Sequence, residues 1–111
     1  MKLLVTGANG FVGSCISSTA KHNHWIVKKQ VRNEALSADD TIVSDIQANT
    51  DWSAHLQDVD CIVHCAARVH QMTDAKSGAD ILQAYRDVNT FGTLNLARQA
   101  ANAGVKRFVF I

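Results

Sequence analysis

Three glycines spaced three residues apart follow the first apolar run of the chain. Residues 3–5 are apolar and lead directly into a segment that contains Gly7, Gly10 and Gly13. A strand that turns at once into a helix needs one glycine for positive φ, a second where the backbone approaches a ligand, and a third where helix and strand pack closely. We expect these three glycines to serve those purposes in that order.

The first amides of the expected helix form a candidate phosphate site. They have no partner within the helix and lie at the positive end of its dipole, so a pyrophosphate is the natural ligand. Asn9 stands where the more familiar dinucleotide fingerprint has its second glycine. The alternative is a tight loop that binds nothing. The phosphate-binding motif requires a helix after the glycines, and the sequence predicts one there, which favours the phosphate site. The apolar face of this expected helix consists of Val12, Ile16, Thr19 and Ala20.

Composition predicts one globular domain. The chain has 111 residues, of which 47% are hydrophobic and 19% charged. The net charge of +1, without a run of like charges, gives no electrostatic footprint for nucleic acid or an anionic membrane. The sequence shows neither a signal peptide nor an apolar segment long enough to span a bilayer, so we expect a cytoplasmic protein.

The three cysteines are expected to be reduced thiols in the core. Cys15, Cys61 and Cys65 are odd in number and have apolar sequence neighbours. A metal site at Cys61, His64 and Cys65 is the alternative. The two apolar residues between Cys61 and His64 indicate instead a buried strand whose side chains alternate between faces, so we expect no metal.

Strands and helices are expected to alternate along the chain. The first expected strand begins at residue 2, and the others cover 25–31, 41–44, 59–64 and 106–111. The expected helices cover 11–22, 51–57 and 80–103. Right-handed crossovers would place such strands in one parallel sheet. We therefore expect a single dinucleotide-binding domain over residues 1–111, a Rossmann-like doubly wound sheet in the order 3-2-1-4-5 that is truncated after the fifth strand.

Two expected elements carry unusual residues. The strand over 25–31 contains Lys28, Lys29 and Gln30, although both faces of a parallel sheet are normally covered, so its register stays open. The long helix has a stripe at helical spacing and is closed by Gly104 as a left-handed cap. The stripe consists of Tyr85, Val88, Gly92, Leu96, Ala100 and Ala103.

Further motifs, in the right order along the chain, resemble those of the extended short-chain dehydrogenase/reductases. Within that superfamily the likeness is to the NAD-dependent epimerase/dehydratase group, which includes UDP-glucose 4-epimerases. The resemblance covers essentially the whole chain, and it is carried by the glycine segment 6–13, the pair Asp45-Ile46, the strand and Ala-Ala turn over 58–67, the Asn-x-x-Gly-Thr-x-Asn-Leu helix over 89–96 and the final segment 104–111.

The resemblance implies a dinucleotide cofactor, NAD, and the residues that hold it. The cofactor-binding residues that it implies are Gly7, Asn9, Gly10, Phe11, Val12, Gly13, Arg32, Asp45, Ile46, Cys65, Ala66, Ala67 and Asn89, with Asp45 and Ile46 against the adenine. It also suggests that His70 touches a nucleotide-sugar substrate. A surface position for that loop histidine is equally open.

Arg32 leaves the choice of cofactor open. Relatives that prefer NAD commonly carry an acidic residue near the end of the second strand, where it accepts hydrogen bonds from ribose hydroxyls. Arg32 stands in that neighbourhood instead. An arginine there can pair with the 2′-phosphate of NADP or stack on adenine, and the alternative is a solvated surface cation.

The residues that carry out the chemistry in this superfamily are not found in the chain. The resemblance implies a Ser or Thr after the fifth strand and a Tyr-x-x-x-Lys pair, but the one tyrosine is Tyr85, and Asn89 stands four residues later. We expect the cofactor-binding portion of a nucleotide-sugar epimerase, inactive alone. The alternatives are a non-catalytic dinucleotide-sensing module, or a reductase or dehydratase of the same superfamily. The apolar last strand also predicts self-association through its open edge.

Overall fold

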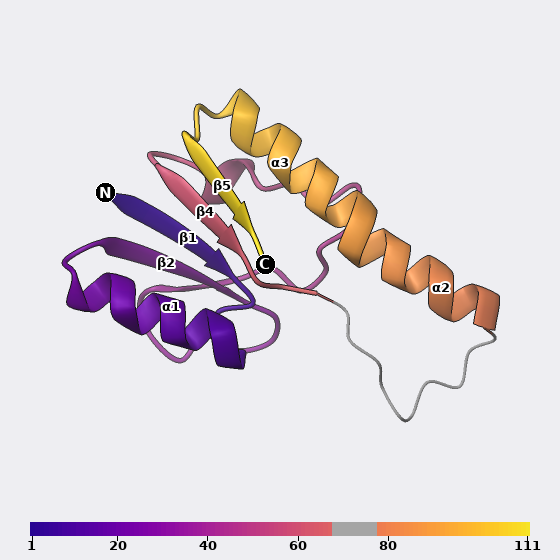
Figure 1. Cartoon of the computed structure of the whole chain (residues 1–111), viewed down its shortest axis with the longest axis horizontal. Coiled ribbons are helices and arrows are strands. Elements are labelled where there is room, and N and C mark those ends of the chain that lie inside the picture. Colours follow the sequence, from indigo (N-terminus) through magenta and orange to yellow (C-terminus); the bar gives the residue numbers. More distant parts are fainter. Residues whose placement is uncertain (68–77) are drawn as a thin grey trace.

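A five-stranded parallel sheet forms the centre of the molecule (Figure 1). The computed structural model describes residues 1–67 and 78–111, and in these residues the strand order is β3-β2-β1-β4-β5. All four strand pairs are parallel. The order confirms the predicted Rossmann-like topology, with bounds β1 Lys2–Thr6, β2 Ile26–Val31, β3 Asp40–Ile42, β4 Cys61–His64 and β5 Arg107–Phe110.

Helices cover both faces of the sheet (Figure 1). Helix α1, Phe11–His22, has the predicted range and lies against one face. The opposite face carries a continuous helical stretch made of α2, Gly78–Arg86, a π-helical segment, Asp87–Gly92, and α3, Thr93–Asn102. A single turn of 3₁₀ helix, Ser53–His55, stands where a longer helix was predicted. None of the helices in the described residues is long and apolar enough to cross a membrane.

Alternation along β1 separates two hydrophobic clusters. Leu4 joins the cluster on the α3 side, which includes Leu96 and Ala100. Leu3 and Val5 point the other way and join the cluster against which the partly buried Ile16 and Ala20 of α1 pack. Successive side chains of a strand point to opposite faces, so one short strand supplies both layers.

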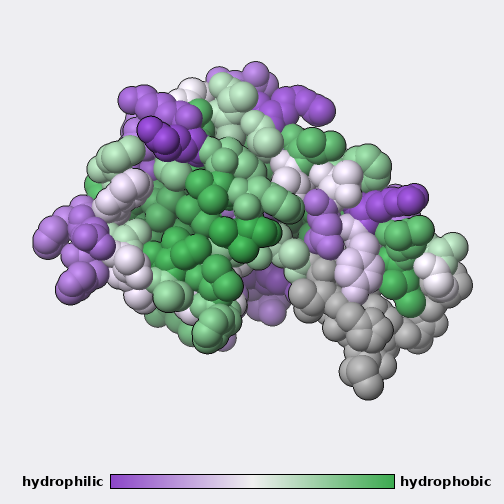
Figure 2. All heavy atoms as spheres, viewed as in Figure 1, coloured by the Kyte–Doolittle hydropathy of each residue, from purple (hydrophilic) through white to green (hydrophobic). Residues whose placement is uncertain are grey.

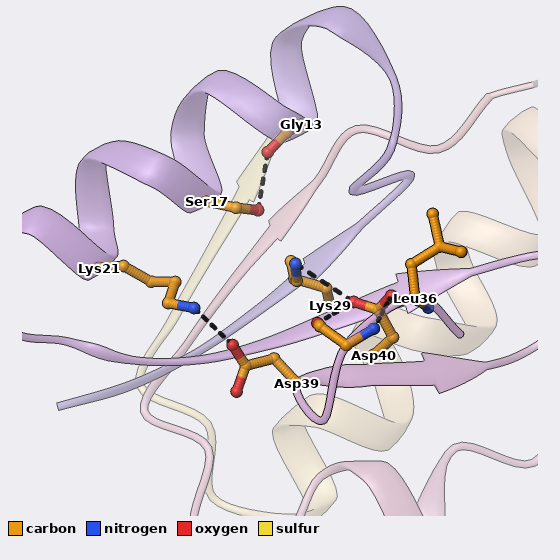
Figure 3. Close-up of polar contacts among 8 residues, drawn as sticks. Gly13, Ser17, Lys21, Lys29, Leu36, Asp39 and Asp40 are labelled. Carbon is orange, nitrogen blue, oxygen red and sulfur yellow. Dashed lines mark hydrogen bonds and ion pairs between the residues drawn. The ribbon is translucent and has the colours of Figure 1, made fainter. Parts of the chain in front are cut away.

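The buried face of α1 is rotated from the predicted one. Ile16 and Ala20 of the predicted face pack against the core, but Val12 and Thr19 are exposed, and the fully buried positions are Gly13 and Ser17. The hydroxyl of Ser17 donates to the carbonyl oxygen of Gly13 at 2.8 Å (Figure 3). This hydrogen bond gives the buried hydroxyl a partner within α1. The rotation follows from Gly13, which must face the turn after β1. The residue one helical turn later, Ser17, then faces the same way and is buried.

The long helix buries most of the central part of its predicted stripe. Gly92, Leu96 and Ala100 are buried as expected. Ala103 is exposed, contrary to the prediction, because it lies just beyond the end of α3. Gly104 follows with φ of +84°, which confirms the left-handed cap.

Lys29 of β2 has its charged partner on the neighbouring edge strand (Figure 3). The Lys29 ammonium lies 3.3 Å from the carboxylate of Asp40, and the two residues are also paired in the register of β2 and β3. The Leu36 amide donates to the same carboxylate at 2.8 Å, and this bond is the main reason why the pKa of Asp40 is lowered. A second pair, between Lys21 of α1 and Asp39, measures 2.7 Å. The charge of Lys29 is therefore accommodated in β2 because the neighbouring strand, β3, is the sheet edge and supplies Asp40.

Two of the three cysteines follow the prediction. Cys61 is buried and Cys65 partly buried, and burial raises the pKa of both thiols. Cys15 is exposed on α1, so the expectation of a core thiol is wrong there. The reason is again the rotation of α1, which turns the Gly13 side of the helix inward.

Candidate functional site

A pocket of about 430 Å³ opens where the strands of the sheet end. The connections that leave β1 and β4 go to helices on opposite faces, so the carboxyl ends of these strands form a topological switch point, where ligands bind in such sheets. Its walls come from the glycine turn, the end of β2, the segments after β3 and β4, and the long helix. The lining residues are Gly7, Asn9, Gly10, Gln30, Val31, Arg32, Ser44, Asp45, Ile46, Gln47, Cys65, Ala66, Ala67, Ala84, Asp87 and Val88.

The glycine turn has the geometry that its spacing predicts. Gly7 adopts φ of +60°. A Cβ on Gly13 would lie 2.2 Å from the Gly7 carbonyl oxygen, so only glycine allows α1 to approach the turn this closely. The Gly10 amide donates to the same Gly7 oxygen at 3.1 Å and closes the turn.

The first turn of α1 is open to an anion. Gly10 is the N-cap, and within the described part of the chain no side chain caps the helix there. The amides of Phe11, Val12 and Gly13 lie in the first turn, where a helix offers them no internal acceptor. The side chain of Phe11 is 93% exposed, so these residues contribute backbone rather than side chains. The exposed amides and the helix dipole together make a phosphate-binding end.

Gln30 links the glycine turn to the segment directly after β3, and sequence reasoning missed it. This side chain is fully buried. Its Oε1 accepts from the Gly7 amide at 2.8 Å, and its Nε2 donates to the Val43 carbonyl at 2.7 Å. A signal was present, because a polar side chain in a strand covered on both faces needs internal partners.

A buried chain of hydrogen bonds fixes the segment after β4. The Thr6 hydroxyl oxygen accepts from the amides of Cys65 and Ala66, both at 3.1 Å, and lies 2.7 Å from Nδ1 of His64. Nε2 of His64 lies 3.0 Å from the hydroxyl oxygen of Thr93 in the long helix. The ends of β1 and β4 are thereby tied to each other and to the helix.

The network also assigns the tautomer of His64. The Thr6 oxygen accepts two amide hydrogens, so its own hydrogen goes to Nδ1. The Thr93 hydroxyl donates to the Asn89 carbonyl at 3.1 Å, so it accepts from Nε2, which carries the imidazole hydrogen. Burial lowers the pKa of His64 to about 4, which keeps the ring neutral at physiological pH.

The segment after β3 packs against the long helix at Gly92. A Cβ on Gly92 would lie 2.6 Å from the carbonyl oxygen of Ile46. The Ile46 side chain is buried, whereas Asp45 and Gln47 on either side are exposed. Gly92 therefore allows the long helix to approach the backbone of this segment closely.

The structure brings most of the predicted site residues into one pocket. Arg32, Asp45 and Ile46 lie on its walls together with the glycine turn and the segment 65–67. Gly10 at the start of α1 lines it, but the predicted residues 11–13 do not, and Asn89 does not line it either, although Asp87 and Val88 do. His70 lies outside the described residues. The pocket thus combines the open end of α1 with one arginine, two aspartates and both polar and apolar side chains, which suits an extended ligand that carries both anionic and ring groups.

Comparison with known proteins gives a consistent result. The family described as "NAD dependent epimerase/dehydratase family" matches residues 3–111. A UDP-glucose 4-epimerase of Vibrio cholerae is 47% identical over 113 residues, which cover 98% of this chain and 34% of that protein. A 3-beta-hydroxysteroid dehydrogenase of Mycolicibacterium neoaurum is 33% identical over 117 residues, which cover 98% of this chain and 31% of the relative. The chain therefore spans about a third of the length of these relatives.

Solved structures share the same fold. A short-chain dehydrogenase/reductase superfamily protein of Agrobacterium tumefaciens, determined with bound NAD, superimposes with a TM-score of 0.79 at 25% identity. The match covers 99% of this chain and 32% of that one. The fold of this chain is thus shared with a protein whose structure was determined with NAD.

Proposed function

The chain belongs to the NAD dependent epimerase/dehydratase family, and on that premise we propose that it forms the cofactor-binding part of a nucleotide-sugar epimerase similar to UDP-glucose 4-epimerase. The observation that carries the proposal is the pocket at the switch point, which joins the open end of α1 to both neighbouring wall segments. The 47% identity to the Vibrio cholerae enzyme supports the choice of reaction.

In this proposal the dinucleotide spans the pocket. The first amides of α1 bind its pyrophosphate, Asp45 and Ile46 hold the adenine, and Ala66 and Ala67 border the nicotinamide. NAD, when bound, supplies the hydride acceptor for transient oxidation at the sugar C4. The residues of this chain bind and orient the cofactor. Thr6 and His64 hold the amides of Cys65 and Ala66 in place beside it.

Calorimetric titration with NAD tests the site. We expect the chain to bind NAD and Gly10→Val to weaken binding by roughly tenfold or more, because a branched side chain would occupy the phosphate position. Lys28→Ala is the matched control, since Lys28 lies on β2 but does not line the pocket. Equal affinity of the Gly10 variant and the unsubstituted chain would refute the site.

The preference between NAD and NADP is expected to depend on Arg32, which lines the pocket and whose side chain is exposed. If its guanidinium meets a 2′-phosphate, Arg32→Ala should weaken NADP binding by about 1.5 to 3 kcal/mol and leave NAD binding nearly unchanged. Unchanged affinities for both cofactors would make Arg32 a surface cation and support a preference for NAD.

We also propose that the 111-residue chain does not turn over substrate by itself. Tyr85 is its one tyrosine, and the residue four positions later is Asn89 rather than lysine. The acid/base pair implied by the family resemblance is therefore not in this sequence. Epimerisation of UDP-glucose or UDP-galactose by the purified chain, free of contaminating enzyme, would contradict this proposal.

A dehydrogenase is the second candidate, and it rests on the 33% identity to the hydroxysteroid dehydrogenase. Both reactions begin with the same bound dinucleotide, so cofactor binding does not separate them. Titration of the NAD-loaded chain with UDP and with a 3β-hydroxysteroid compares the two ligand classes directly. Binding of the steroid alone would favour the dehydrogenase.

Self-association is a further proposal, supported by the outer edge of β5. In the described residues β5 pairs with β4 alone, and Val109, Phe110 and Ile111 are 43%, 62% and 58% exposed. Figure 2 shows hydrophobic residues gathered over the middle of this view, where β1, β4 and β5 lie in Figure 1. Such an edge is a template for pairing with another chain. A monomer at high micromolar concentration, measured by light scattering, would contradict it.

A further inference from the structure

The pocket wall at residues 44–47 lies outside regular secondary structure. It follows β3, which ends at Ile42, and precedes the 3₁₀ turn at Ser53. No ladder of strand hydrogen bonds therefore holds Asp45, Ile46 and Gln47, although all three line the pocket. A wall that contacts a ligand must nevertheless be ordered, so its backbone groups need other partners.

Thr50 supplies the first set of partners. Its hydroxyl donates to the Asp45 carbonyl at 2.6 Å and accepts from the Gln47 amide at 2.8 Å. One side chain thus closes a loop around Ile46 and fixes the backbone on both sides of it. The hydroxyl uses its donor and an acceptor position at once, which makes the loop geometry specific.

Two amide side chains of α3 supply the second set. Asn95 donates through Nδ2 to the carbonyls of Gln47 and Thr50, at 3.2 and 2.8 Å. Gln99, one turn later, donates through Nε2 to the Thr50 carbonyl at 2.7 Å and to Oδ1 of Asn95 at 2.9 Å. The Gln99 Oε1 accepts from the Trp52 amide at 2.8 Å. Both side-chain amides therefore use both of their donor hydrogens on this loop or on each other.

Gly92 extends the same helix surface toward the pocket. Its missing side chain lets the helix approach the Ile46 carbonyl, and the next two turns carry Asn95 and Gln99. The long helix thereby holds the loop by direct backbone contact at one end and by hydrogen bonds at the other.

We propose that Asn95, Gln99 and Thr50 are positioning residues that hold the pocket wall 45–47 in register with the adenine of the bound dinucleotide. The inference rests on the proposed dinucleotide site. None of the three lines the pocket, so they act through the backbone of the wall and not by contact with the ligand. Loss of their hydrogen bonds should allow the wall to move and should weaken its recognition of the base.

The test compares NAD with nicotinamide hypoxanthine dinucleotide, which differs from NAD only in the purine. We expect the unsubstituted chain to prefer NAD. Asn95→Ala should weaken NAD binding by roughly tenfold, the effect of about one or two lost hydrogen bonds, and should bring the ratio of the two affinities toward one. A purely structural role would lower both affinities equally and leave the ratio unchanged, which would overturn the inference.

A second pair of variants guards against loss of folding. Thr50→Val removes the hydroxyl at nearly constant shape, whereas Thr50→Ser keeps it. We expect the valine variant to lose discrimination between the two dinucleotides and the serine variant to retain it, with circular dichroism confirming the fold of each. Equal discrimination by the valine and serine variants would overturn the inference.

Asn102→Ala is the matched control for Asn95→Ala, because Asn102 is exposed at the far end of the same helix. It should bind both dinucleotides like the unsubstituted chain, and a loss of discrimination in this variant would overturn the assignment to Asn95. Failure of the unsubstituted chain to bind NAD at all would refute the proposed function, and the inference with it. Normal NAD binding with unchanged discrimination in Asn95→Ala would refute the inference alone.

Discussion

The glycine turn and the wall at residues 45–47 border the same pocket but are built in different ways. The turn is closed by its own neighbours in sequence, through the Gly10 amide and the Gly7 carbonyl and through the close approach of Gly13. The wall is held by the nearby Thr50 and also by Asn95 and Gln99, which lie more than forty positions away along the chain. A local motif thus forms the glycine-turn side of the pocket. The wall at 45–47 is ordered in part by the long helix, which packs on the face of the sheet opposite to α1.

This difference predicts unequal tolerance. A turn closed by backbone geometry has few ways to relax, so added atoms strain it directly. A loop held by side-chain hydrogen bonds can shift, so a change there should affect binding more than folding. Variants at the two places, and at the residues that connect them, test the comparison.

The largest effect is expected from Gly13→Ala. The new Cβ would lie 2.2 Å from the Gly7 oxygen, so α1 must move away from the turn. We expect a loss of at least about 3 kcal/mol in the free energy of unfolding, measured by urea denaturation. Gly78→Ala is the control, since a Cβ there meets no atom within 4 Å, and it should unfold at the same or a higher urea concentration. Equal stability of the two variants would refute the packing argument.

Acid should destabilise the protein through His64. Burial holds the folded pKa near 4, below the ordinary value of 6.5, and the ring's neighbours on β1, β5 and the long helix are uncharged. The unfolded chain therefore binds a proton first. This contribution to stability is complete above pH 6.5 and falls by about 2 to 3 kcal/mol as the pH is lowered toward 4.

His64→Gln provides the comparison for that pH dependence. Other groups titrate equally in both proteins, so the difference between their urea midpoints at pH 7 and pH 4.5 isolates the histidine. We expect the unsubstituted protein to lose more stability over this range. Parallel pH profiles would show that His64 titrates normally in the folded state.

Gln30→Leu should disconnect the turn from the segment directly after β3. The substitution leaves the Gly7 amide and the Val43 carbonyl without their side-chain partner in a buried place. We expect a loss of about 2 kcal/mol in unfolding free energy together with weaker NAD binding. Gln30→Glu should retain the Gly7 contact and lose the Val43 contact, so calorimetry on both variants separates the two ends of the link. If the leucine variant were as stable as the unsubstituted chain, Gln30 would not contribute to stability by linking the turn to this segment.

The smallest effect on stability is expected from Gly92→Ala. Its Cβ would meet the Ile46 carbonyl at 2.6 Å, but the wall can yield and alanine favours the helix, so we expect a loss of only about 1 kcal/mol. NAD affinity should fall more clearly, because the displaced segment lines the pocket. If thermal melting instead shows a loss as large as that of Gly13→Ala, the two sides of the site are equally rigid.

Much of the architecture could be predicted from local patterns in the sequence. Alternating apolar runs and helical segments predicted the parallel order 3-2-1-4-5, and the glycine spacing predicted the positive φ of Gly7 and the tight packing at Gly13. These predictions succeed because backbone sterics and hydrophobic periodicity act over a few residues. The pair Asp45-Ile46, which the family resemblance assigns to the cofactor site, lies on the pocket wall.

Only the tertiary structure decided how the site is held together. The partners of Gln30 lie in the glycine turn and directly after β3, and the wall 45–47 depends on amides of α3 that the sequence shows only as polar residues on a helix. The inward face of α1 includes Ile16 and Ala20, which the apolar spacing predicted, but its full extent followed from the contact at Gly13. A local pattern determines which element forms, whereas the partner of a buried polar group depends on which distant segment packs against it.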